Sequence, residues 1–264
     1  MHLLRLAVLT CCCSSLACAS AIVRPSITPS EPRPDALLVL PGFGYGRAGE
    51  RALRTLAPAM TADGVDLYVA KFIARSGLDE SAVRLRRFVQ DNELERYERV
   101  HVFAFLAGGW TFNAIAEEGT FENLATIVYD RSPYQERAPR IAVNELPVLA
   151  WLRYGSAVFD VARRPYAPLG REGVRVGIVV ETKPTKFIER FEGSARQQGP
   201  YQFACGEFKQ RYDDCIYVAL NHDELYVRFS EVWPEVRSFI RNGRFTPAAN
   251  RTPPEPARHV ARGR

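Results

Sequence analysis

The chain has 264 residues, of which 47% are apolar and 25% are charged. This composition fits one sizeable globular domain and excludes collagen-like and low-complexity chains. The net charge of +5 lies at the two ends, because Arg5 contributes one positive charge, residues 243–264 contribute four, and residues 6–242 are neutral. A neutral body favours no nucleic-acid groove, so we expect no nucleic-acid partner.

Residues 1–21 predict an export signal. Arg5 precedes an apolar stretch that is too short to span a bilayer. The residues before Cys18 fit a bacterial lipoprotein signal, in which that cysteine carries the lipid and anchors the protein to a membrane. A plain signal peptide cut near Ala19 or Ala21 fits as well. Either interpretation places the protein outside the cytoplasm of a bacterium, in the periplasm or at the outer membrane.

Two Pro-rich segments flank the body of the chain. Residues 22–35 combine Pro with Ser and Thr, which predicts an extended tether. Residues 243–264 combine Pro with Arg and Ala, which predicts a disordered tail. Residues 36–242 remain as a single domain.

Short apolar runs alternate with segments of helical period through this domain. The runs, which predict strands, are 36–40, 65–70, 100–105, 125–129, 174–180 and 216–220. Helical faces recur between them, and the clearest begins at Phe229 and ends at Gly243. The alternation predicts an α/β fold with a mostly parallel sheet covered by helices on both faces. The run at 100–105, which is apolar apart from His101, is expected near its middle.

Residues 133–169 interrupt the alternation with a long segment rich in Pro and aromatic residues. A segment of this length between strands is typical of a cap over a binding site. A packed excursion with no gating role is the alternative.

Cys205 and Cys215 are the cysteines that remain once the export signal is removed. In an oxidising compartment such a pair tends to form a disulfide, which we expect here. Two free buried thiols are the alternative.

The segment after the run at 100–105 carries the most specific pattern. Ala104, Leu106 and Gly108 stand where Gly-x-Ser-x-Gly would place its first glycine, its serine and its second glycine. The chain here resembles the α/β-hydrolase superfamily of lipases and esterases. Its nucleophile position holds a leucine, which cannot attack a carbonyl. We expect Leu106 at the tip of a tight, strained turn, with a helix beginning near Gly108.

The resemblance implies roles for other residues. The loop after the first strand resembles the family's oxyanion loop, so the backbone N–H groups of Phe43 and Ala107 are the expected oxyanion donors. His222 follows the last strand, where the family keeps its catalytic histidine. Glu181 follows the penultimate strand and is the expected acid, with Asp130 on the preceding strand as the rarer alternative.

Structural roles compete with each of these assignments. His222 would then be a satisfied loop histidine, Glu181 a surface acid, and Asp130 part of an ordinary turn paired with Arg131. His101 lies away from the carboxyl edge of the sheet, so we expect it to be structural. Neither body histidine has a cysteine or carboxylate at ligand spacing in the sequence, so no metal or other cofactor is expected.

Two classes of function follow. The first is a non-catalytic binder of an apolar or acyl ligand, or of a protein partner, with a pocket lined by Phe43, Leu106 and Trp110 beneath the cap. The second is an active ester hydrolase with an atypical arrangement centred on His222 as general base. The missing serine favours the first.

Overall fold

Six strands form one sheet in which every neighbouring pair is parallel. A computed structural model describes residues 34–117, 121–130, 137–198, 204–205 and 210–254. The strand order is β2-β1-β3-β4-β5-β6. The strands are β1 (Asp35–Leu40), β2 (Val65–Val69), β3 (Val100–Ala104), β4 (Leu124–Asp130), β5 (Arg175–Glu181) and β6 (Asp214–Val218). The predicted parallel sheet is confirmed, with β3 inside it.

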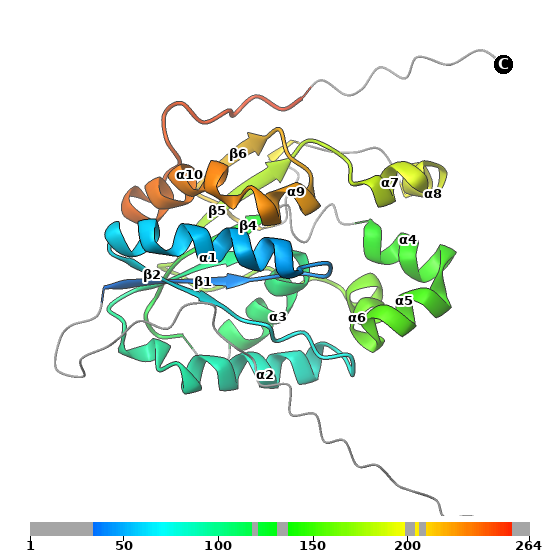
Figure 1. Cartoon of the computed structure of the whole chain (residues 1–264), viewed down its shortest axis with the longest axis horizontal. Coiled ribbons are helices and arrows are strands. Elements are labelled where there is room, and N and C mark those ends of the chain that lie inside the picture. Colours follow the sequence, from blue (N-terminus) through cyan, green and yellow to red (C-terminus); the bar gives the residue numbers. More distant parts are fainter. Residues whose placement is uncertain (1–33, 118–120, 131–136, 199–203, 206–209, 255–264) are drawn as a thin grey trace, which may run out of the picture.

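Helices cover both faces of this sheet (Figure 1). One face packs against α1 (Arg47–Ala62), α9 (His222–Val227) and α10 (Phe229–Asn242), and the other against α2 (Leu78–Asp91) and α3 (Leu106–Ala116). A short 3-10 turn, η1 (Leu94–Arg96), follows α2. Because both faces are covered, alternate residues of β1 enter two separate hydrophobic cores, which explains why the strands are apolar along most of their length. In the described part of the chain, no helix is both long and apolar enough to cross a bilayer.

The helix α1 continues through Pro58. Phe187 and Ala195 lie on two successive short helices, α7 (Lys186–Arg190) and α8 (Glu192–Gln197). The end of α10 is as predicted, because Gly243 adopts a left-handed conformation with φ 68°.

The segment expected to form a cap contains three short helices. They are α4 (Ala138–Glu145), α5 (Pro147–Tyr154) and α6 (Ser156–Arg163), and they lie together beyond one end of the sheet (Figure 1). Numerous contacts join α4 to α5 and to α6. Residues 131–136, at the start of the predicted insertion, lie outside the described residues.

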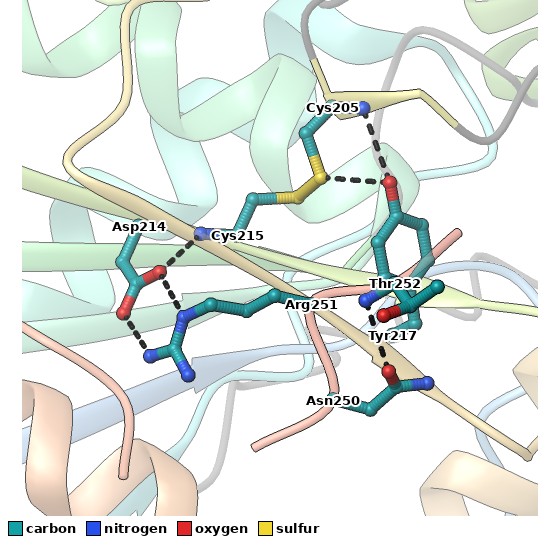
Figure 2. Close-up of a disulfide and its surroundings, with 7 residues drawn as sticks. All are labelled: Cys205, Asp214, Cys215, Tyr217, Asn250, Arg251 and Thr252. Atoms are coloured by element: carbon teal, nitrogen blue, oxygen red, sulfur yellow. Dashed lines mark hydrogen bonds and ion pairs between the residues drawn. A yellow bond between two sulfur atoms is a disulfide. The ribbon is translucent and has the colours of Figure 1, made fainter. Parts of the chain in front are cut away.

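Cys205 and Cys215 form the predicted disulfide, with Cα atoms 6.3 Å apart (Figure 2). The Tyr217 hydroxyl lies 3.1 Å from Cys205 Sγ and accepts a hydrogen bond from the Cys205 N–H. The bridge therefore ties the segment before β6 to the strand itself.

The prediction of a disordered tail is wrong for residues 243–254. Phe245 is buried, and Arg251 pairs through two nitrogens with the buried Asp214 carboxylate at 2.7 and 3.1 Å (Figure 2). The Tyr217 N–H donates to the Asn250 carbonyl at 2.8 Å. Composition indicated disorder because the partners that order this segment lie far away in the sequence. Residues 1–33 and 255–264, which include Cys18 and most of the predicted tether, lie outside the described residues.

The turn from β3 into α3 also differs from expectation. The helix begins at Leu106, two residues before the predicted start. Among the described residues, Glu93 is the non-glycine residue with positive φ, so Leu106 does not adopt the left-handed strained backbone expected for it. The predicted close packing is present, since a Cβ built on Gly108 would lie 2.3 Å from the Leu40 carbonyl oxygen.

We predict that Gly108→Ala lowers the free energy of unfolding by about 1–3 kcal/mol, because its methyl group would overlap the backbone of β1. Urea denaturation of the purified variant measures this change. Gly193→Ala is the matched control, because Gly193 lies in α8 and a Cβ built there would have no neighbouring atom within 4 Å. Equal stability of the two variants would contradict the close approach of α3 to β1.

Candidate functional site

Three side chains from separate elements meet beyond the carboxyl ends of the strands. Asp130 is the last residue of β4, Glu181 is the last residue of β5, and His222 is the first residue of α9. Asp130 Oδ2 lies 3.0 Å from His222 Nδ1, and Glu181 Oε1 lies 3.5 Å from the same nitrogen. The structure thus brings together all three residues that the sequence singled out for catalysis.

The start of α9 fixes the position of the histidine. The Asn221 side chain accepts a hydrogen bond from the Glu224 N–H at 2.9 Å, and the Glu224 side chain accepts one from the Asn221 N–H at 2.9 Å. This reciprocal capping box sets the first turn of the helix. His222 immediately follows the cap, so the orientation of the helix aims its ring at the two strand ends.

The two carboxyl groups are almost completely buried, and this controls their ionisation. Burial raises the pKa of Asp130, the neighbouring Glu181 raises it further, and His222 only partly offsets the increase, so that it lies well above its usual value. Adjacent buried carboxylates repel each other. One carboxyl of the pair therefore retains a proton while the other faces the imidazole.

The pKa of the His222 imidazole shifts in the direction opposite to the one that burial alone would give. Burial alone would lower the pKa of His222, but the Tyr226 side chain and the two acids together raise it well above its usual value. In the charged form both ring N–H groups have an acceptor, since Asp130 faces Nδ1 and the Tyr226 oxygen lies 3.3 Å from Nε2. The two acids and Tyr226 therefore favour the protonated form of His222.

Tyr226 occupies the side of the histidine that faces away from the acids. Its hydroxyl oxygen accepts a hydrogen bond from the Gly42 N–H at 2.8 Å as well as lying against His222 Nε2. The ring stacks on Phe105, with centroids 4.2 Å apart, and Phe105 also meets the His222 ring edge-on. His222 is thus both hydrogen-bonded to acids and packed among aromatic rings.

Burial raises the pKa of Tyr226 far above its usual range, so its hydroxyl remains protonated. The sequence had suggested no role for this residue. A signal was present, because a residue four positions after a histidine lies on the same face of a helix. That signal depends on knowing that α9 begins at His222.

A cavity of about 340 Å³ opens beside the histidine. Phe43, Leu106 and His222 line it from the sheet side, and the cap helices supply the facing wall through residues such as Ala142, Tyr154 and Val158. Its volume lies in the range of small-molecule sites. The cap segment therefore forms part of the candidate site.

Trp110 requires a correction, because the sequence placed it in the lining of this cavity. It instead packs near Leu106 and Val161, with its ring edge-on to Tyr166 at 5.3 Å. It lies one turn after Leu106 in α3 and is not among the residues that line the cavity. Phe43 and Leu106 are placed as expected.

The expected oxyanion donors lie near the histidine, but a different amide is engaged. Gly42, one residue before Phe43, is the residue whose N–H reaches the Tyr226 hydroxyl. Ala107 is the second residue of α3, and its nitrogen would lie 3.6 Å from a Cβ built on Gly42. The loop after β1 and the start of α3 are therefore adjacent.

No known protein family matches this chain, and no curated protein matches it. Solved structures do. The mature form of Bacillus licheniformis lipase BlEst2 matches 83% of this chain and 97% of its own, at 12% identity and a TM-score of 0.50. AbyA5 matches 81% of this chain and 65% of its own, at 17% identity and a TM-score of 0.51. The propeptide form of the lipase matches 85% of this chain and 54% of its own, at 12% identity and 0.52.

The chain has the α/β-hydrolase fold. This confirms the architecture that the sequence predicted from its strand alternation and from the residues around Leu106. At these identities the likeness establishes the fold alone. The activity of this α/β-hydrolase-fold chain has to be argued from its own site.

The ligand atoms of Asp130, Glu181 and His222 lie within 4.8 Å of one another, a spacing at which such groups could hold a metal ion. The sequence spacing did not show this proximity, because the residues come from β4, β5 and α9. In this structure Asp130 and His222 contact each other directly through a hydrogen bond.

His101, which we predicted to be structural, lies in the core. Its Nδ1 is 2.9 Å from the Thr126 hydroxyl, and burial lowers its pKa to about 4. It therefore remains neutral near pH 7 and provides a contrast to His222.

We predict that the free energy of unfolding falls as the pH rises above about 6.5, the usual pKa of histidine. Folded His222 holds its proton more tightly than the unfolded chain does. Its contribution is thus complete below pH 6.5 and is lost as the pH rises through the raised folded pKa, at about 1 kcal/mol per pH unit. Urea denaturation over a pH series measures the slope.

His222→Gln should reduce this slope, and the raised pKa of Asp130 accounts for the part that remains. His101→Gln is the control and should retain it, because the lowered pKa of His101 confines its own contribution to lower pH. A slope that is unchanged in His222→Gln would contradict the assignment of the raised pKa to His222.

Proposed function

We propose that this protein is a non-catalytic member of the α/β-hydrolase fold that binds an apolar or acyl ligand. The observation that carries the proposal is the engagement of His222 Nε2 by the Tyr226 hydroxyl, which also takes the Gly42 N–H. In a serine hydrolase the nucleophile would need that nitrogen and a substrate oxyanion would need such an amide. In this chain the buried, protonated Tyr226 hydroxyl occupies both His222 Nε2 and the Gly42 N–H.

The residue at the expected nucleophile position supports the same conclusion. Leu106 begins α3 and lines the cavity beside His222. Its side chain offers neither an attacking atom nor a proton. The turn around it also lacks the positive φ that would store strain at an exposed nucleophile.

The cavity indicates the class of ligand. Its walls are largely apolar, and two arginines, Arg137 and Arg153, contribute to the lining. An apolar body with an anionic end, such as a fatty acid, would match both features, because guanidinium groups bind carboxylates well. An apolar segment of a protein partner is the other occupant that the cavity favours.

The hydrogen-bonded pair of Asp130 and His222 supports a second candidate function, ester hydrolysis. Asp130 and His222 retain a hydrogen bond at 3.0 Å, and His222 lines the cavity. In an active ester hydrolase, His222 Nε2 would take a proton from water as the water oxygen attacks the ester carbonyl. The backbone N–H groups of Phe43 and Ala107 would hold the oxyanion. Tyr226 would first have to leave that nitrogen.

We predict that the unaltered protein neither hydrolyses short-chain nitrophenyl esters nor reacts with a fluorophosphonate probe. Leu106→Ser should gain at most trace activity, because Tyr226 still occupies Nε2. Adding Tyr226→Phe should increase this activity by about tenfold or more, since one competing hydrogen bond is removed. His222→Ala in the double variant should abolish it.

Binding is measured in parallel. Laurate should stabilise the unaltered protein and raise its midpoint of thermal unfolding, and Leu106→Arg should reduce the affinity by filling the cavity. Strong ester hydrolysis by the unaltered protein, lost in His222→Ala, would overturn the non-catalytic proposal. No stabilisation by laurate, together with no hydrolysis, would leave the protein partner as the occupant to pursue.

We further propose that the protein acts outside the cytoplasm of a bacterium, in the periplasm or held to a membrane through lipidated Cys18. The Cys205–Cys215 disulfide supports an oxidising compartment. Expressed in a bacterial host, the unaltered chain should fractionate with membranes. Cys18→Ser should release it or block its processing, and Cys13→Ser is the matched control. A soluble product whose N-terminus lies after Cys18 would contradict lipidation.

A further inference from the structure

The cap helix α5 presents an unusual apolar surface to solvent. Six large apolar side chains are markedly exposed in the part of the chain that the structure describes, and four of them lie on this eight-residue helix. These four side chains, which we call the α5 strip, are 54–69% exposed: Val148, Leu149, Trp151 and Leu152. Single exposed apolar residues are ordinary, but a cluster of this kind marks an interaction surface.

The opposite side of α5 faces the cap. Ala150 is buried, and Tyr154 packs against Phe43 with ring centroids 5.0 Å apart. The helix therefore turns Ala150 and Tyr154 toward the cap, and turns Trp151 and its largest aliphatic residues toward solvent. Folding alone does not require these outward side chains.

Positive charge lies at the end of the α5 strip. Arg75 donates to the backbone carbonyls of Trp151 and Arg153, which fixes its guanidinium at the C-terminal end of the helix. Arg153 itself is exposed, and its Nε donates to the Tyr154 hydroxyl. Within the described residues neither arginine has a carboxylate within ion-pair distance, so both charges are available to an anionic partner.

We propose that α5 docks on the surface of a lipid bilayer that contains anionic lipids. Such a surface offers acyl chains to an apolar strip and negative headgroups to the cations beside it. A helix of this kind lies in the interface and does not span the membrane. The inference does not require lipidation at Cys18, since it rests on the α5 strip with Arg75 and Arg153, although Arg153 also contributes to the lining of the cavity.

The test uses the full chain and vesicles of phosphatidylcholine mixed with phosphatidylglycerol. Brominated phosphatidylcholine quenches a tryptophan that enters the acyl region. We expect it to quench emission from Trp151, measured as the difference between the unaltered protein and Trp151→Phe. Leu149→Ser with Leu152→Ser should lower vesicle partitioning by about tenfold or more. Arg153→Gln should lower it about fivefold on anionic vesicles and little on phosphatidylcholine alone.

Val83→Ser with Val227→Ser is the matched control, because both residues are exposed but lie on other helices, α2 and α9. This control should partition like the unaltered protein. Any N-terminal contribution to membrane binding is common to all variants, while the quenching reports on Trp151 alone. Absence of quenching, or equal partitioning of the strip and control variants, would overturn the proposal. Self-association without vesicles that the strip variant abolishes would assign the surface to a second copy and would also overturn it.

Discussion

The burial of two carboxyl groups at the ends of adjacent parallel strands is the constraint on which the site depends. Asp130 and Glu181 repel each other in such surroundings, so one of them retains a proton and His222 balances the charge of the other. The capping box at Asn221 begins α9 at His222, which places Tyr226 one turn later against Gly42. The charges at the strand ends and the start of α9 together position the groups beside the cavity.

The turn into α3 separates two properties that are usually found together. The close approach of Gly108 to Leu40 persists, so the small residues around the turn serve the packing of a helix on a sheet. The backbone strain does not persist, because Leu106 already belongs to the helix. In this chain the close packing of α3 on β1 is therefore achieved without a positive φ at Leu106.

A feature could be predicted from the sequence when the residues that cause it lie close together in the chain. Every strand was predicted to within two residues at each end, because burial on both faces leaves a continuous apolar run. Asp130, Glu181 and His222 could be named because parallel strands end at the same edge of a sheet. The position of Tyr226 beside His222 depends on where α9 begins. The order of residues 243–254 depends on the distant Asp214, which no local pattern reveals.

That ordered C-terminal segment has a consequence for solubility. In the described sheet β6 is an edge strand, paired with β5 on one side only, and an open edge of this kind invites strands from other molecules. Residues of the same chain lie at this edge. The Asn250 carbonyl accepts a hydrogen bond from the Tyr217 N–H, and Arg251 forms an ion pair with Asp214. Asn250 and Arg251 thereby cover part of the β6 edge and hinder edge-to-edge aggregation, and chains that lack them would lose that protection.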